Sequence, residues 1–287
     1  MNSKFFLGTV QFGMDYGINN KEGRVGEGEV ENILRIAAKT GIRTLDTAYF
    51  YGNAMERIGN FHRNSDFLFN VNTKFKIDPK CTISEQLTES ITCLAIESVD
   101  TYFYHSFSDY VNNPGILNEL GELKKKGYFK KIGVSIYNNE EMLQCINDDQ
   151  VDVIQLPFNL LDNNNLRGDL IKAAKKRGKE IQVRSVFLQG LFFMNIADLP
   201  SRLYSLEHYL TKIQKIASEL NVSIAELALA YVKKEPLIDG IIIGVDSTSQ
   251  LVNNFLATGF EMDEYYYNRV NEIIVKEKAL LNPQNWQ

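Results

Sequence analysis

The sequence predicts an α/β protein, a (β/α)8 TIM barrel with extra C-terminal helices. Three observations support this fold class. Short apolar, strand-like runs alternate with amphipathic helical patterns along nearly the whole chain of 287 residues. There are eight such units and no linker or change of composition between them, so residues 1–287 are expected to form a single barrel domain. Ionisable side chains fall where the strand-like runs end, which is where such barrels carry their chemistry.

Each expected strand ends after an apolar or alternating run. The expected ends lie near Thr9, Asp46, Lys74, His105, Ser135, Gln155, Arg184 and Gly244. Between them lie amphipathic helical patterns, the first long one closed by Gly41 as a C-cap. Thr82 with Glu85, and Ser223 with Glu226, have the spacing of capping boxes that begin later helices.

The longest gap between strands, from Arg184 to Gly244, is expected to hold an inserted loop or extra helix at about residues 192–203. Helical patterns at residues 248–256 and 263–280 then finish the chain. Gly23, Gly26 and Gly28 precede a helix, but no strand leads into them. They are therefore expected to form a turn and not a dinucleotide-binding loop.

Composition and charge exclude several classes of protein. The net charge is −5, and the basic runs at residues 124–126 and 175–177 come late in helical patterns, where cations suit the helix dipole. A nucleic-acid surface would need a broader basic stripe. Cys81, Cys93 and Cys145 lack C-x-x-C spacing, so neither a disulfide framework nor a metal site is expected. The chain shows no secretory signal or membrane span, and a cytoplasmic location is expected.

The segment LDTAYFYGNAME, residues 45–56, is the most informative part of the chain. An apolar lead-in ends at Asp46, and Tyr51 follows on an expected loop. Lys74 ends the next strand-like run and His105 the one after it. Singly, each residue has a commoner structural explanation, such as a turn aspartate or a packed tyrosine. Their order and their shared position at strand ends predict a site for acid–base chemistry.

These residues also carry a resemblance to a known family. D-T-A-x-x-Y-G-x-x-x-E, together with Lys74 and His105, resembles the catalytic tetrad of the aldo/keto reductases, and the similarity runs from residue 7 to about residue 254. The resemblance implies an NAD(P)H-dependent oxidoreductase that reduces a small-molecule carbonyl substrate, including sugar-derived ones. Tyr51 would be the general acid, and Lys74, held by Asp46, would lower the pKa of the phenol. His105 would hydrogen-bond the carbonyl oxygen of the substrate.

Cofactor binding is implied in the same way. Hydride has to come from a cofactor, and this family binds nicotinamide across the barrel mouth without a G-x-G-x-x-G loop. The matching positions lie at strand ends and in the loops beyond them: Gly8, Thr9, Asp46, Ser135, Gln155, Arg184, Ser185, Phe187, Gly190, Gly244, Ser247, Gln250 and Asn254. Among these, Ser135 and Gln155 would hold the carboxamide. No metal site is expected.

Two positions depart from the family's pattern. Ile136 stands where the family usually has an asparagine that binds the carboxamide, and Arg184 where many members have an aromatic residue stacked on the nicotinamide. A guanidinium plane can stack as well, or it can contact phosphate. Around Ser247 and Gln250 the basic residues that many members use for the 2′-phosphate are absent, and Asp246 lies beside them. The resemblance still implies NADPH/NADP+ ahead of NADH.

Two further functions stay open from the sequence. One is a Schiff-base aldolase with Lys74 as nucleophile, which would leave Tyr51, Ser135 and Gln155 without a purpose. The other is a non-catalytic or slow nicotinamide-binding regulatory subunit, and the complete tetrad argues against it. The pattern carries no expectation about an oligomer.

The resemblance also implies that the substrate pocket is shaped by the loops after the fourth and seventh strands and by the end of the chain, at residues 106–115, 186–203 and 282–287. Their side chains suggest a partly apolar, aromatic-lined pocket, whereas the commoner reading of aromatic residues in loops is local packing. The side chains concerned are Phe107, Tyr110, Phe187, Phe192, Phe193, Met194 and Trp286.

Overall fold

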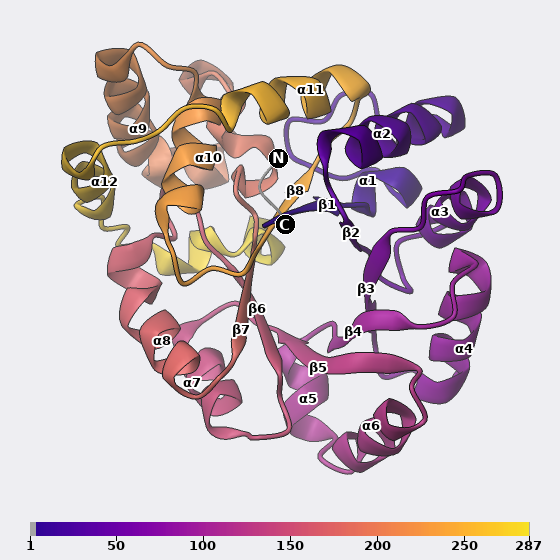
Figure 1. The fold of residues 1–287 in the computed structure, drawn as a ribbon. Helices are drawn as coiled ribbons and strands as arrows, with labels where there is room; N and C mark the ends of the chain where they lie inside the picture. The colour runs from indigo at the N-terminus through magenta and orange to yellow at the C-terminus, as the bar shows by residue number, and fades with distance from the viewer. Residues whose placement is uncertain (1–3, 287) are drawn as a thin grey trace.

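The computed structural model describes residues 4–286, and eight parallel strands close into a barrel in the order of the chain (Figure 1). The strands are β1 (Phe5–Gly8), β2 (Thr44–Asp46), β3 (Asn70–Phe75), β4 (Val99–Tyr104), β5 (Phe129–Ser135), β6 (Val153–Pro157), β7 (Glu180–Arg184) and β8 (Gly240–Gly244). The predicted barrel is confirmed. Each predicted strand end lies within two residues of an observed one.

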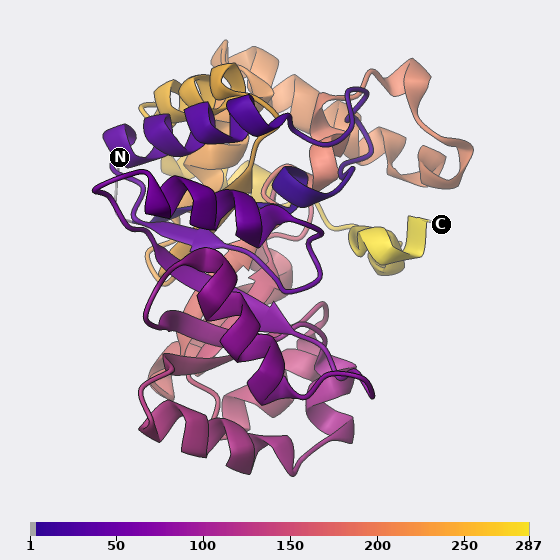
Figure 2. The ribbon, with the colours of Figure 1, turned by 90° about the vertical axis from the view of Figure 1, so that its right-hand side faces the viewer.

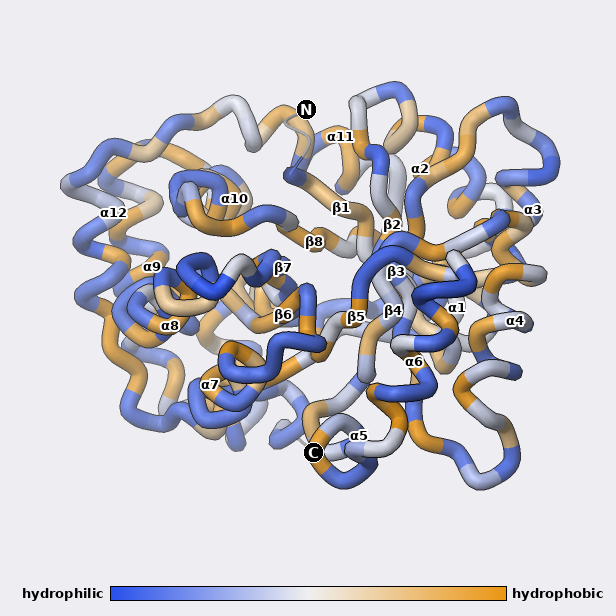
Figure 3. The backbone as a smooth tube through the Cα atoms, turned by 60° about the horizontal axis from the view of Figure 1, so that its bottom comes forward, coloured by the Kyte–Doolittle hydropathy of each residue, from blue (hydrophilic) through white to orange (hydrophobic). Residues whose placement is uncertain are grey.

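Helices surround the barrel and bury one apolar face against it. They are α1 (Val10–Gly13), α2 (Glu27–Thr40), α3 (Ala54–Arg63), α4 (Ile83–Leu94), α5 (Phe107–Asn112), α6 (Ile116–Lys125), α7 (Asn139–Asn147), α8 (Asn164–Lys176), α9 (Glu207–Leu220), α10 (Ile224–Lys234), α11 (Thr248–Ala257) and α12 (Glu264–Asn271). In Figure 3, β1 and β8 are mostly apolar, whereas the helices alternate between polar and apolar turns. The capping boxes predicted at Thr82 and Ser223 are confirmed.

The register of the strands gathers the predicted site residues at one rim. Gly8 pairs with both Asp46 and Gly244, and Ser135 pairs with Gln155. These residues lie at or near the carboxyl ends of their strands. In a parallel barrel those ends meet on one side, where the following loops converge. Strand ends far apart in the sequence therefore become neighbours.

The connection between β7 and β8 contains the predicted insertion. It forms the 3-10 helices η1 (Leu188–Phe193), η2 (Ile196–Asp198) and η3 (Ser201–Leu206) ahead of α9. Figure 2 shows that these turns and the last turns of the chain, η4 (Lys278–Leu281) and η5 (Pro283–Trp286), project from the same end of the barrel. This end of the molecule thus carries walls that rise above the strands.

One predicted helix is much shorter than expected. The pattern at residues 263–280 predicted a continuous helix, but α12 ends at Asn271. The buried amide of Asn163 donates to the carbonyls of Val270 and Ile273, at 3.0 and 2.9 Å, and takes up acceptors that a longer helix would need. Residues 273–277 then form no regular structure, with Ile273 and Val275 buried and Ile274 exposed. A tertiary contact therefore ends the helix.

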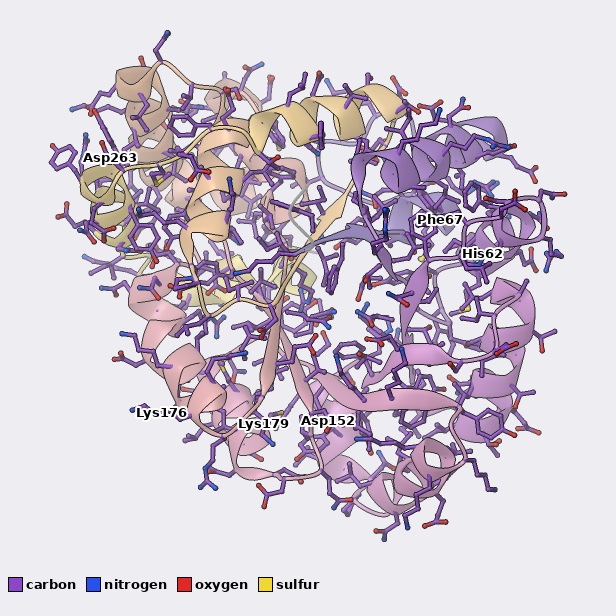
Figure 4. All side chains as sticks on the ribbon, in the orientation of Figure 1. His62, Phe67, Asp152, Lys176, Lys179 and Asp263 are labelled. Atoms are coloured by element: carbon purple, nitrogen blue, oxygen red, sulfur yellow. The ribbon has the colours of Figure 1, made fainter. Side chains whose placement is uncertain are left out.

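Polar residues elsewhere on the barrel make structural contacts. Asp152 and Lys179, close together in Figure 4, precede β6 and β7, and Lys179 Nζ donates to the Val151 carbonyl at 2.7 Å. His62 on α3 pairs its Nδ1 with the Leu94 carbonyl at 2.7 Å, and burial lowers its pKa. Within residues 4–286, no helix is both long and apolar enough to cross a membrane.

Candidate active site

A cavity of about 640 Å³ opens at the carboxyl rim of the barrel. The four residues predicted to form the tetrad, Asp46, Tyr51, Lys74 and His105, all line it. They come from the ends of β2, β3 and β4 and from the loop before α3. The structure therefore brings together four side chains that span 60 positions of the sequence.

Asp46 and Lys74 form a buried ion pair at the base of this cavity. The Asp46 carboxylate receives Lys74 Nζ on one oxygen and Gln155 Nε2, at 2.8 Å, on the other. Lys74 Nζ also donates to the Thr47 carbonyl at 3.1 Å. Both ionic side chains are almost fully buried, so each holds the other in place and neither can turn away without leaving a buried charge unpaired.

Tyr51 lies on a tight turn that packs against the first loop of the barrel. Its N–H donates to the Ala48 carbonyl and its own carbonyl accepts from Ala54, both at 3.0 Å. A Cβ on Gly13 would lie 1.8 Å from the Tyr51 carbonyl oxygen. Gly52 turns the chain here with a φ of 52°, a conformation that side chains disfavour. Two glycines therefore let the backbone bring the phenol to the cavity.

His105 follows β4 and meets Tyr51 edge to face, with ring centroids 5.7 Å apart. Lys74 Nζ lies 5.7 Å from the centroid of the Tyr51 ring. Burial, helped by the charge of Lys74, lowers the pKa of His105 to about 3. The imidazole is therefore neutral at physiological pH, and its Nδ1 has no hydrogen-bond partner among the described residues.

Burial also dominates the pKa of the phenol. It raises the pKa of Tyr51 well above the ordinary value, the Asp46 carboxylate adds to the rise, and Arg184 opposes it. Burial lowers the pKa of Lys74 against the pull of Asp46. The resemblance implies that Lys74 lowers the pKa of Tyr51, and in this structure burial outweighs any such lowering. Tyr51 keeps its proton at neutral pH.

Most of the predicted cofactor residues line the same cavity. They are Gly8, Thr9, Asp46, Ser135, Gln155, Arg184, Ser185, Phe187, Gly190, Gly244, Gln250 and Asn254. Ser247 is the exception. Its hydroxyl caps α11 by accepting from the Gln250 N–H at 3.2 Å and contacts the Ser249 hydroxyl at 3.0 Å. The side chain is thus engaged within its own helix turn.

The polar groups in the cavity suit a nicotinamide. Gln155 uses its amide nitrogen on Asp46, which leaves its buried Oε1 without a partner among the described residues. An acceptor left buried and unpaired is costly, and the NH2 of a carboxamide is a donor that would satisfy it. The residues present therefore fit the cofactor. Within residues 4–286, no group of three His, Cys, Asp or Glu side chains could hold a metal ion.

The loop after β7 has an unusual backbone. Ser185, Leu188 and Gln189 have φ values of 59°, 48° and 56°, followed by Gly190 at 87°. Such conformations cost free energy in residues with side chains and cluster at functional sites. The Asn159 side chain holds this loop by donating to the Ser185 carbonyl at 3.0 Å.

One wall of the cavity comes from the segment after α1 and was not expected from the sequence. The Ile18 N–H donates to the Gln189 carbonyl at 3.0 Å, and the Gln189 amide donates to the Tyr16 hydroxyl at 3.1 Å. Cavity residues that sequence reasoning missed include Gln11, Tyr16, Gly17, Asn19, Asn20, Tyr137 and Asn253. The polar run Tyr-Gly-Ile-Asn-Asn at residues 16–20, soon after the first strand, was the available signal.

The expected substrate loops contribute unevenly. Of their predicted side chains, Phe187 and Phe193 line the cavity, while Phe107, Tyr110, Phe192, Met194 and Trp286 do not. The Tyr110 hydroxyl donates to Asp148 at 2.7 Å, and the Trp286 indole donates to the Leu280 carbonyl at 2.8 Å. Tyr110 and Trp286 therefore make local contacts and do not face the cavity. Gln287, the last residue of the third loop, lies outside the described residues.

The model of the Aldo/keto reductase family matches residues 4–275. The NADH-specific methylglyoxal reductase of Escherichia coli (strain K12) is 23% identical over 203 residues, 64% of this chain and 61% of that protein, which is less than two thirds of its length. The uncharacterized oxidoreductase YqkF of Bacillus subtilis (strain 168) is 24% identical over 250 residues, 79% of this chain and 81% of that protein.

Among solved structures, the aldo-keto reductase AKR11C1 of Bacillus halodurans, in its holo form, superposes with a TM-score of 0.77 at 16% identity and covers 96% of this chain and 94% of that one. This likeness supports the fold. The family match spans nearly the whole chain and agrees with the barrel. The chain therefore belongs to the aldo/keto reductase family, whose members are NAD(P)H-dependent oxidoreductases.

Proposed function

We propose that the protein reduces an aldehyde or ketone, sugar-derived ones included, to an alcohol. The observation that carries this proposal is the convergence of Tyr51, His105 and the Asp46–Lys74 ion pair on one cavity. A general acid has to be within hydrogen-bonding reach of the atom that it protonates and has to hold its proton at the working pH. A buried Tyr51 with a raised pKa meets the second condition at neutral pH.

Each of the four side chains has a separate role. Tyr51 donates its hydroxyl proton to the carbonyl oxygen as negative charge develops there. Neutral His105 donates a hydrogen bond to the same oxygen and fixes its orientation, which a neutral imidazole does through one N–H. Lys74, anchored by Asp46, places a positive charge 5.7 Å from the Tyr51 ring and stabilises the phenolate that remains.

NAD(P)H supplies the hydride when bound. Ser135 and Gln155 would hold its carboxamide, with the unpaired Oε1 of Gln155 as acceptor. The predicted preference for NADPH rests on the resemblance and on the backbone amides at the start of α11, since a helix N-terminus favours phosphate. Asp246 opposes it, because a carboxylate in this part of the cavity repels a 2′-phosphate. Fluorescence titration with both cofactors tests the preference, and equal or tighter NADH binding would contradict it.

The test of the proposed function is the Tyr51→Phe variant. The ring remains and the proton donor is removed, so NAD(P)H oxidation with methylglyoxal should slow by roughly 10²–10⁴-fold. The dissociation constant of the cofactor should change little. Near-wild-type turnover would show that Tyr51 is not the acid.

The same preparation separates the alternatives. An aldolase that works through Lys74 would be trapped by borohydride with a carbonyl compound and no cofactor. A binding subunit without turnover would bind NAD(P)H and leave it unoxidised with every aldehyde. Aldehyde-dependent oxidation of NAD(P)H without lysine trapping is the result that we expect.

A further inference from the structure

Arg184 is a cation in the cavity that forms no ion pair among residues 4–286. We propose that its guanidinium binds a carboxylate of the substrate, so that the preferred substrates are small oxo acids. This inference rests on the proposed carbonyl reduction and adds the substrate class.

The guanidinium is held firmly by two neighbours. Arg184 Nη2 donates to the Ile136 carbonyl at 3.0 Å, and the guanidinium carbon lies 4.2 Å from the centroid of the Tyr137 ring. A guanidinium on an aromatic face is stabilised by stacking and by the cation–π attraction. Ile136 and Arg184 are the two departures from the family's pattern, and here they contact each other. The guanidinium of Arg184 is thus fixed in place at the rim of the cavity.

Most of the N–H donors of Arg184 have no hydrogen-bond partner within residues 4–286. A guanidinium carries five N–H groups, and within residues 4–286 only the bond to Ile136 and a long one of 3.4 Å to Ser185 use them. The two carboxylates that interact electrostatically with Arg184 already have other partners, since Asp46 pairs with Lys74 and Asp162 pairs with Arg167. A partly buried charge with unused donors lowers its free energy by binding an anion.

The position of the charge indicates where that anion lies. Arg184 lines the same cavity as Tyr51 and His105 and lowers the pKa of both, so it is within electrostatic reach of the groups that would hold the substrate carbonyl. A carboxylate bound by Arg184 would therefore sit close to the reacting carbon. The planar fork of arginine matches a carboxylate in two parallel hydrogen bonds, which also orients the molecule.

The experiment compares two pairs of aldehydes that differ in charge and little in shape: glyoxylate with methylglyoxal, and 4-carboxybenzaldehyde with 4-formylbenzamide. The wild-type enzyme should show a higher kcat/KM for the acid of each pair. In Arg184→Met, kcat/KM for the acids should fall roughly 10- to 100-fold, as expected for losing charge-assisted hydrogen bonds. The kcat/KM values for the neutral aldehydes report any accompanying loss of NAD(P)H binding, so the quantity that tests the carboxylate site is the ratio of kcat/KM between the acid and the neutral aldehyde of each pair, which should fall.

Two further variants serve as controls. Arg184→Lys keeps the charge without the fork and should retain part of the preference for the acids. Arg202→Met, on the exposed turn η3, makes the same change of net charge away from the cavity lining and should leave all four substrates unaffected.

The outcomes distinguish this inference from the proposed function. An equal loss on acids and neutral aldehydes in Arg184→Met, or a loss explained by weaker NAD(P)H binding in a fluorescence titration, would overturn the carboxylate site and leave the reductase intact. A wild-type enzyme that reduces methylglyoxal but shows no preference for the acids would also overturn the carboxylate site and leave the proposed reductase function intact. A wild-type enzyme that reduces none of the four aldehydes contradicts the proposed function itself.

Discussion

Replacing Gly13 by alanine should damage catalysis without touching any group that contacts the substrate. The added Cβ would lie 1.8 Å from the carbonyl oxygen of Tyr51 and 2.8 Å from the backbone nitrogen of Ala54. Cβ atoms keep at least 3.0 Å from such neighbours, so the two loops have to separate by about 1.2 Å. Both contacts are backbone atoms, and no side-chain rotation can relieve them.

That displacement acts directly on the turn that carries the phenol. A misplacement of about 1 Å costs roughly 10²-fold in rate where proton donor and acceptor have to be aligned. We therefore expect kcat/KM of Gly13→Ala to fall by about two orders of magnitude. The overpacked loop should also destabilise the protein by ~1–3 kcal/mol.

The matched control is Gly121→Ala, where the same methyl group enters α6 and a Cβ would meet nothing within 4 Å. This substitution should raise the free energy of unfolding by about 0.5–1 kcal/mol, and the activity should stay the same. Steady-state kinetics and thermal unfolding of both variants provide the test. A Gly13→Ala enzyme with wild-type kcat/KM would refute the claim that close backbone packing positions Tyr51.

Three other substitutions or conditions give separate checks. Lys74→Met leaves the Asp46 carboxylate buried without its partner and should cost roughly 3–5 kcal/mol of stability along with most of the activity; wild-type turnover and an unchanged pH–rate profile would contradict this. The pKa of folded His105, about 3, lies below the ~6.5 of an unfolded imidazole, so between these values the folded state binds fewer protons and this group lowers stability as the pH falls. The kcat/KM profile should accordingly lack a limb near pH 6.5, and such a limb would show that His105 titrates there. Asp246→Ser should strengthen NADPH relative to NADH by roughly tenfold in a fluorescence titration, because it removes a like charge; an unchanged ratio would place the 2′-phosphate elsewhere.

The fold was predictable because local signals and long-range requirements agree in this chain. Apolar strand runs end at polar residues, and capping boxes such as that at Thr82 mark where helices begin. The helix at residues 263–280 was predicted too long because its end depends on the amide of Asn163, more than 100 positions away. No periodicity within the segment contains that information. Tertiary contacts override propensity at such points.

Some properties of the candidate site were likewise predictable from the sequence, and others were not. Asp46, Lys74 and His105 could be named from the sequence because strand ends fix their position and their chemistry is specific. The direction of the pKa shift of Tyr51 could not be predicted, because it depends above all on how deeply the phenol is buried in the folded barrel. The wall formed by residues 16–20 was missed as well, because only its polar composition is visible in the sequence and the contact between Tyr16 and Gln189 forms when the barrel closes.

Arg184 and Ile136 show why a residue-by-residue comparison falls short. Considered alone, Ile136 lacks the side-chain hydrogen bond that the family's asparagine makes to the carboxamide. Arg184, considered alone, lacks the aromatic ring that many members stack on the nicotinamide. In the barrel, β5 and β7 both flank β6, so the backbone after Ser135 lies within reach of the arginine side chain. The backbone carbonyl of Ile136 and the ring of Tyr137 then hold the guanidinium of Arg184 in the cavity. The two departures from the family's pattern therefore coincide with one positive charge in the cavity, the guanidinium of Arg184. Replacing Arg184 by methionine should change the preference for acids over neutral aldehydes more than it changes the overall capacity for reduction.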